Sequence, residues 1–210
     1  VAHFGAINGL GQQTLKLTAP GVPDVYQGTE LWDFSLVDPD NRRPVDFTRR
    51  AQFLTDLVSL TDGSSLTSNL HDGRIKLFVT RTVLQLRRTH PDLFAYGDYT
   101  PLEVLGERAA HVLAFRRRLP PGAESPGQEL VVAVPRLSYR LLSGQEALPT
   151  GPGVWGGTRL ALTLEDAGAT YRNVFTGATL RPGEEGDDRS TLHLGEVLAV
   201  DLERTPVDAA

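Results

Sequence analysis

The 210-residue sequence predicts an α+β protein in which helices come first and an antiparallel β-sandwich follows. Three observations lead to this prediction. Up to about position 90, apolar residues recur at steps of three and four, as they do on one face of a helix. Beyond that point, short apolar runs are separated by Gly, Pro and acidic clusters, as in a sheet of short strands. The composition, 40% hydrophobic and 22% charged, is that of a folded protein rather than a disordered one.

The first part of the chain predicts three helices and one brief strand. A helix is expected over 4–17, weakened by its glycines, and a short buried strand over 22–26. Thr48 is the predicted N-cap of a second helix that runs to about residue 60. A third helix over 75–86 should end near His90 because a proline follows it.

The second part predicts short strands over 111–115, 130–134, 139–142, 160–164, 171–175 and 192–201. The segment 120–127, rich in Pro and Gly, is predicted to be a surface loop between strands. Three consecutive arginines, Arg116 to Arg118, come at the end of the first strand. We expect them on a solvated strand edge, where their charge would discourage pairing with other chains.

Composition excludes several classes of function. Without Cys there is no disulfide framework, Cys-based zinc site or Cys nucleophile. A net charge of -5 argues against a protein that binds nucleic acid by general electrostatics. No apolar run approaches the roughly 20 residues that span a bilayer, so we expect no membrane partner. The sequence also lacks the pattern of a secretory leader, and we therefore expect a cytoplasmic location.

Motifs for metals and cofactors are also missing from the sequence. The five histidines have neither HxxxH nor HxH spacing, so no metal site is predicted. Neither a Walker A nor a dinucleotide-binding motif is present, and we expect no cofactor. The chain also lacks Met, even at position 1, and enters directly into patterned sequence, which suggests a fragment of a longer protein.

The segment from Tyr26 to Asp46 has a different character. It has no period, and it combines aromatic residues with Asp, Asn, Glu and Arg. A loop of this length within a compact domain is usually functional or disordered, and its aromatic residues argue against disorder. Aromatic faces beside carboxylates, amides and guanidinium groups suit a polyhydroxylated ligand. The same residues would also suit a structural Arg–Asp network around a packed Trp. The residue types alone do not distinguish an enzyme site from a lectin-like binding module.

The string of residues 19–31, APGVPDVYQGTEL, resembles the eighth strand and following loop of α-amylase superfamily barrels. The continuation over 32–46, WDFSLVDPDNRRPVD, is similar to the maltooligosyltrehalose synthase family of that superfamily. Segments 8–10, 15–18, 75–77 and 111–115 fit the same family, so that the resemblance runs almost from end to end. It implies the carboxyl-terminal end of a (β/α)8 barrel over 1–90, with a substrate-cleft loop at 27–47, and a C-terminal β-sandwich over 91–210.

This resemblance implies a parent enzyme that converts the reducing-end α-1,4 linkage of a maltooligosaccharide into an α,α-1,1 linkage. The family reaction is an intramolecular transglucosylation with retention, through a carboxylate nucleophile, an acid/base carboxylate and a third assisting carboxylate. Those groups belong to barrel strands four, five and seven, and this chain is expected to begin after strand seven. No catalytic residue is therefore assigned here, and the isolated chain is expected to be inactive without the remainder of the barrel.

Barrel active sites lie at the carboxyl ends of the strands, so the loop after Tyr26 should border the substrate cleft. By resemblance, Arg42 is the first candidate for contact with a sugar hydroxyl. The other predicted maltooligosaccharide-binding or supporting residues are Arg43, Asp40, Asn41, Tyr26, Gln27, Glu30 and Trp32. Three alternatives stay open: a non-catalytic glycan-binding module, a structural or interaction domain, and another glucosidase or transglucosylase of the superfamily.

Overall fold

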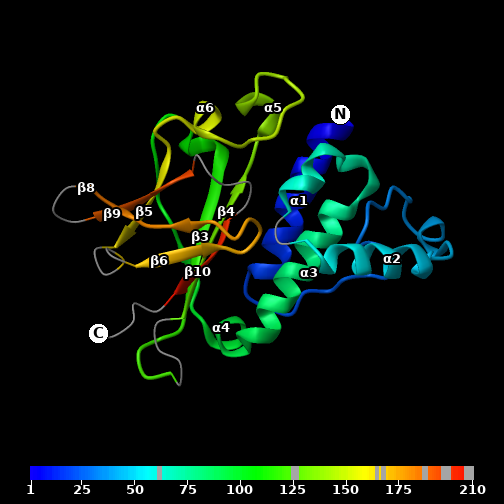
Figure 1. The fold of residues 1–210 in the computed structure, drawn as a ribbon, viewed down its shortest axis with the longest axis horizontal. Helices are drawn as coiled ribbons and strands as arrows, with labels where there is room; N and C mark the ends of the chain where they lie inside the picture. The colour runs from blue at the N-terminus through cyan, green and yellow to red at the C-terminus, as the bar shows by residue number, and fades with distance from the viewer. Residues whose placement is uncertain are drawn as a thin grey trace.

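The computed structural model describes residues 1–60, 63–123, 128–163, 166, 169–185, 189–194 and 200–205. Its longer helices and its strands lie on opposite sides of the molecule (Figure 1). The helices are α1 (Ala2–Thr18), α2 (Phe47–Val58), α3 (Arg74–Thr89), α4 (Pro91–Tyr96), α5 (Ser138–Leu141) and α6 (Pro152–Trp155). Short 3-10 turns are η1 (Asp40–Arg42), η2 (Ser64–Ser68), η3 (Leu70–Asp72) and η4 (Ala109–His111). The predicted mixture of helix and antiparallel sheet is thus confirmed.

The described strands form two antiparallel sheets. A six-stranded sheet has the order β1 (Thr100–Pro101), β3 (Val112–Arg118), β4 (Glu129–Pro135), β10 (Val200–Thr205), β6 (Thr170–Asn173) and β7 (Thr179–Leu180). A four-stranded sheet has the order β2 (Val104–Leu105), β5 (Arg159–Thr163), β9 (Arg189–His193) and β8 (Gly183–Glu185). The register of β3 and β4 places Val112 opposite Pro135 and Arg118 opposite Glu129.

The two faces of β3 and β4 contribute to different apolar clusters, because side chains alternate along a strand. Val131 and Ala133 belong to a cluster that joins both sheets and includes Ile7 of α1. Leu130 and Val132 belong to a second cluster, formed with residues of α3 and α4. A third cluster lies among the helices and includes Leu31 from the long loop. Buried side chains therefore connect the helices to the six-stranded sheet.

Helix α1 uses its glycines to approach its neighbours closely. A Cβ added to Gly11 would lie 3.7 Å from the carbonyl oxygen of Pro135 on β4. A Cβ on Gly9 would lie 3.1 Å from Cζ3 of Trp32, which is tighter than ordinary contact. The low helix propensity of these residues is therefore offset by packing against α1.

Four details of the predicted elements are wrong. Residues 22–26 form no strand, because no described strand lies beside them to complete the backbone hydrogen bonds. Residues 139–142 contribute to α5, a helical turn that buries Leu141 and Leu142. The range 192–201 contributes to β9 and to β10, which lie in different sheets, and 195–199 lie outside the described residues. Asp46, not Thr48, caps α2, since its carboxylate accepts a hydrogen bond from the backbone N–H of Arg49.

The expected loop over 120–127 has no helix or strand over 120–123, and 124–127 lie outside the described residues. The helices predicted over 4–17 and 75–86 are confirmed as α1 and α3. Most of the other strand predictions are confirmed within a few residues by β3, β4, β5 and β6. Strands β5 and β6 alternate in burial along their length, whereas β4 is a continuous apolar run.

The prediction that Arg116 to Arg118 lie on a solvated edge is also wrong. Strand β3 has β1 on one side and β4 on the other, and only 1% of Arg117 is exposed. Its guanidinium donates hydrogen bonds to five backbone carbonyls, those of Asp98 (2.8 Å), Thr18 (3.2 Å), Leu93 (3.2 Å), Phe94 (3.2 Å) and Gly97 (2.9 Å). These carbonyls lie at or near the ends of α1 and α4, where the helix dipoles are negative and stabilise a buried cation.

Candidate functional site

The base of the site loop (residues 27–47) is held by an ion pair. Glu30 and Arg50 of α2 form this pair, and both side chains are largely shielded from solvent. The second carboxylate oxygen of Glu30 accepts a hydrogen bond from Gly28 N–H at 3.0 Å, while Arg50 donates to the Gly28 carbonyl at 2.7 Å. Gly28 has a φ of 96°, a conformation that favours glycine. Glu30 therefore fixes the turn that leads into the loop.

Trp32 attaches the next part of the loop to the helices. Its indole Nε1 donates to the carbonyl of Leu70 at 2.5 Å. Gly9 leaves room for the indole ring, and the ammonium of Lys76 lies 5.4 Å from the ring centroid. Lys76 also donates to the Leu31 carbonyl at 3.1 Å. The indole is therefore held from both α1 and α3, and its polar atom is already used.

Two titratable groups near Trp32 have shifted pKa values. Burial, and secondarily the positive charge of Lys16, lower the pKa of Lys76 below its ordinary value, against the opposing effect of Asp33 and Glu30. The Ser35 hydroxyl and its backbone N–H donate to Asp33, at 2.6 Å and 2.9 Å, and they lower the pKa of that carboxyl. Asp33 therefore provides a stable negative charge close to Lys76.

Two arginine–aspartate pairs lie at the tip of the loop. Arg42 binds Asp38 with two hydrogen bonds, from Nε at 2.5 Å and from Nη2 at 2.7 Å. Arg43 binds Asp40, whose other carboxylate oxygen accepts from the backbone N–H of Leu36 at 2.7 Å. The hydrogen bond from Leu36, followed by the one from Arg43, lowers the pKa of Asp40. Both guanidinium groups stay exposed, so their remaining N–H groups are available to a ligand.

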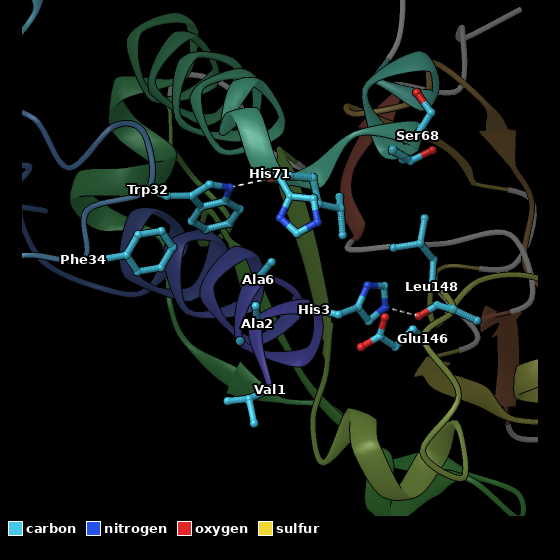
Figure 2. Close-up of a pocket in the computed structure, with 14 residues that line it drawn as sticks. Val1, Ala2, His3, Ala6, Trp32, Phe34, Ser68, His71, Glu146 and Leu148 are labelled. Atoms are coloured by element: carbon cyan, nitrogen blue, oxygen red, sulfur yellow. Dashed lines mark hydrogen bonds between the residues drawn. The ribbon is translucent and has the colours of Figure 1, made fainter.

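The eight predicted site residues do not form one cluster around a cavity. Tyr26, Gln27 and Asn41 are exposed, and Glu30 is partly buried in its ion pair with Arg50. Arg42 and Arg43 are exposed at the tip of the loop, and Asp40 beside them is partly buried. Of the eight, Trp32 is the residue that lines the cavity in Figure 2.

This cavity has a volume of about 600 Å³ and brings together residues that the sequence prediction missed. Figure 2 shows Trp32 and Phe34 on one side and His3, Glu146 and Leu148 on the other, with His71 between them. These residues come from α1, the site loop, η3 and the segment after α5. Because the segments are far apart in the sequence, no local motif could have indicated the cavity.

Within the described residues, no group of three or more His, Cys, Asp or Glu side chains is arranged to hold a metal ion. Among the helices that the structure describes, none combines the length and the apolar character needed to cross a membrane.

Comparison with known proteins finds similarity to one class of enzyme. No protein-family model matches the chain. It is 43% identical, over 161 residues, to proteins named "Putative maltooligosyl trehalose synthase" from two Mycobacterium tuberculosis strains, CDC 1551 / Oshkosh and H37Rv. The match covers 74% of this chain and 18% of each relative.

Solved structures lead to the same enzyme. The maltooligosyltrehalose synthase from Arthrobacter ramosus matches 98% of this chain with a TM-score of 0.72 and 30% identity, over 23% of its own length. A crystal structure of another maltooligosyl trehalose synthase matches 97% of this chain with a TM-score of 0.62 and 27% identity, over 22% of its length. The resemblance predicted from the sequence is confirmed, and the chain spans about a fifth of the proteins that it matches.

Proposed function

We propose that this chain is the carboxyl-terminal part of an enzyme that makes glycosyl trehalose from maltooligosaccharides. The whole protein would convert the reducing-end α-1,4 linkage to α,α-1,1 by intramolecular transglucosylation. The observation that carries this proposal is the similarity in sequence and in fold to maltooligosyltrehalose synthases over most of the chain.

In this proposal, residues 1–90 are the end of a (β/α)8 barrel and residues 91–210 a C-terminal β-sandwich. Helices α1 and α3 pack against each other, and the segment 22–26 follows α1 without a strand partner among the described residues. An eighth barrel strand would have this environment if its neighbours belonged to another part of the protein. The side chain of Val22, 96% exposed, is consistent with a surface that the remainder of the barrel covers.

The site loop would border the substrate cleft and supply sugar contacts rather than chemistry. Arg42 is pre-positioned by Asp38, and Arg43 by Asp40, so both can donate to hydroxyl groups with little loss of side-chain freedom. The reacting carboxylates would come from the remainder of the barrel, whose closed cleft would keep water away from the glycosyl intermediate.

The test is to incubate maltopentaose with the full-length protein and, separately, with the 210-residue chain. Loss of reducing ends and the anomeric NMR signals of the product measure the reaction. We expect a non-reducing product from the full-length protein and none from the chain alone. Turnover by the chain alone would contradict the assignment of chemistry to the remainder of the barrel. Release of glucose or shorter reducing sugars without a 1,1 linkage would instead indicate a hydrolase or another transglucosylase.

A further inference from the structure

The cavity in Figure 2 lies where the helices meet the segment that follows α5. Its volume of about 600 Å³ falls within the roughly 300–1,000 Å³ of small-molecule sites. Its lining comes from both predicted domains: His3, Trp32 and His71 belong to residues 1–90, and Glu146 and Leu148 belong to residues 91–210. Such junctions are common places for ligand binding.

Two aromatic side chains form one wall of the cavity. Trp32 has its Nε1 committed to Leu70, and Gly9 and Lys76 fix its ring, so the indole presents apolar surface in a defined position. Phe34, two residues along the loop, is 87% exposed beside it. An aromatic side chain this exposed has little role in the core of the described chain.

Polar groups line the opposite side. The Nε2 atom of His3 lies 2.8 Å from the carbonyl of Ala147, so Nε2 carries the hydrogen and donates it. Nδ1 of a neutral His3 ring is then an acceptor. The Glu146 carboxylate is exposed and accepts hydrogen bonds, and the exposed His71 can donate or accept.

Charge narrows the class of ligand. Neither Lys nor Arg is among the described residues that line the cavity, and Glu146 adds a negative charge. Val1 also lines it, but its α-amino group would be a neutral amide in the longer protein proposed above. A phosphorylated or carboxylated ligand would lack a cationic side chain there and would be repelled by Glu146. A neutral polyol fits better, since its apolar C–H face can stack on an aromatic ring while its hydroxyls bond to carboxylate and imidazole.

We propose that this cavity is a binding subsite for glucose units of an α-1,4-glucan, with Trp32 and Phe34 as the stacking wall and His3, His71 and Glu146 as hydroxyl partners. The proposal rests on the proposed function, because that function supplies the glucan. It adds a site assembled by both parts of the chain, separate from the exposed Arg42–Arg43 tip.

The first experiment uses histidine labelling in the full-length protein. Diethyl pyrocarbonate acylates accessible imidazoles, and peptide mass spectrometry reads each histidine separately. We expect saturating maltoheptaose to slow labelling of His71 at least threefold. Labelling of His111, which does not line the cavity, should stay unchanged. Equal labelling of His71 with and without maltoheptaose would overturn the subsite.

The second experiment measures maltoheptaose binding by calorimetry. Phe34→Ala should raise Kd by about fivefold or more, and Glu146→Gln by a smaller factor. Tyr96→Ala is the matched control, because Tyr96 is also an exposed aromatic residue (74%) but ends α4, at the opposite end of the helical side from the start of α1 (Figure 1). Unchanged Kd values for Phe34→Ala and Glu146→Gln would contradict the proposal.

The two proposals fail in different ways. If the full-length protein makes the 1,1-linked product but His71 is unprotected and Phe34→Ala binds normally, the subsite is wrong and the proposed function stands. If His71 is protected but no 1,1-linked product forms, the subsite stands and the proposed function is wrong.

Discussion

The arginines of the site loop and those of β3 serve contrasting purposes. Arg42 pairs with Asp38 at the surface, where 69% and 57% of their side chains are exposed. Arg117 is 1% exposed and has only carbonyl oxygens as its described hydrogen-bond partners. A surface pair contributes little stability and can exchange its partners for a ligand. A buried guanidinium shared by two helices and a strand holds the fold together and is shielded from any ligand.

The largest effect is expected from Arg117→Met. This change removes the shared donor and leaves five carbonyls to be satisfied near the ends of α1 and α4, so we expect a loss of about 3 kcal/mol or more in the free energy of unfolding. Urea unfolding followed by circular dichroism measures it.

Arg117→Lys is the matched control, because lysine keeps the positive charge but has fewer hydrogen-bond donors. We expect its loss in the free energy of unfolding to lie between zero and that of Arg117→Met. A stability within about 0.5 kcal/mol of the parent for Arg117→Met would refute the anchoring role.

A smaller, pH-dependent effect is expected from Glu129. Burial raises its pKa above the ordinary value of 4.5, and the nearby Asp166 adds to the rise. A hydrogen bond from the Tyr171 hydroxyl, at 2.7 Å, and the charges of Arg116 and Arg118 oppose it.

The folded state then binds a proton more tightly at Glu129 than the unfolded state does. This contribution to stability is complete below pH 4.5 and is lost as the pH rises through the raised pKa, with a slope of at most about 1.4 kcal/mol per pH unit. Glu129→Gln should remove this part of the pH dependence in urea unfolding. The same slope in the variant would show that Glu129 is not its source.

The sequence was sufficient to predict helices and strands with a clear apolar pattern. It was not sufficient for features that depend on contacts between segments far apart in the chain. The apolar pattern of α3 was sufficient to predict this helix, because its apolar face is continuous. The burial of Arg117 depends on helix ends about 20 and 100 residues away, which a run of three arginines does not reveal. The segment 22–26 was predicted as a strand from its composition, yet a strand needs a partner that the described chain lacks.

The candidate site shows the same difference between what a local pattern predicts and what only the fold brings together. Aromatic and charged residues indicated the loop 27–47 as a ligand-binding segment, and the structure gives Glu30 and Trp32 defined anchoring contacts. The roles of the exposed residues stay a prediction. His3, His71 and Glu146 carry no spacing signal, because the fold brings them together from separate segments.

The most direct measurement compares Arg42→Ala in the full-length protein with the parent, using maltopentaose kinetics and urea unfolding together. We expect kcat/KM to fall more than about tenfold, which corresponds to a loss of about 1.4 kcal/mol of transition-state binding. The free energy of unfolding should change by less than about 0.5 kcal/mol, since the Arg42–Asp38 pair is exposed. Arg88→Ala, at an exposed arginine near the end of α3, should change neither quantity. Parent-like kinetics for Arg42→Ala would contradict the account.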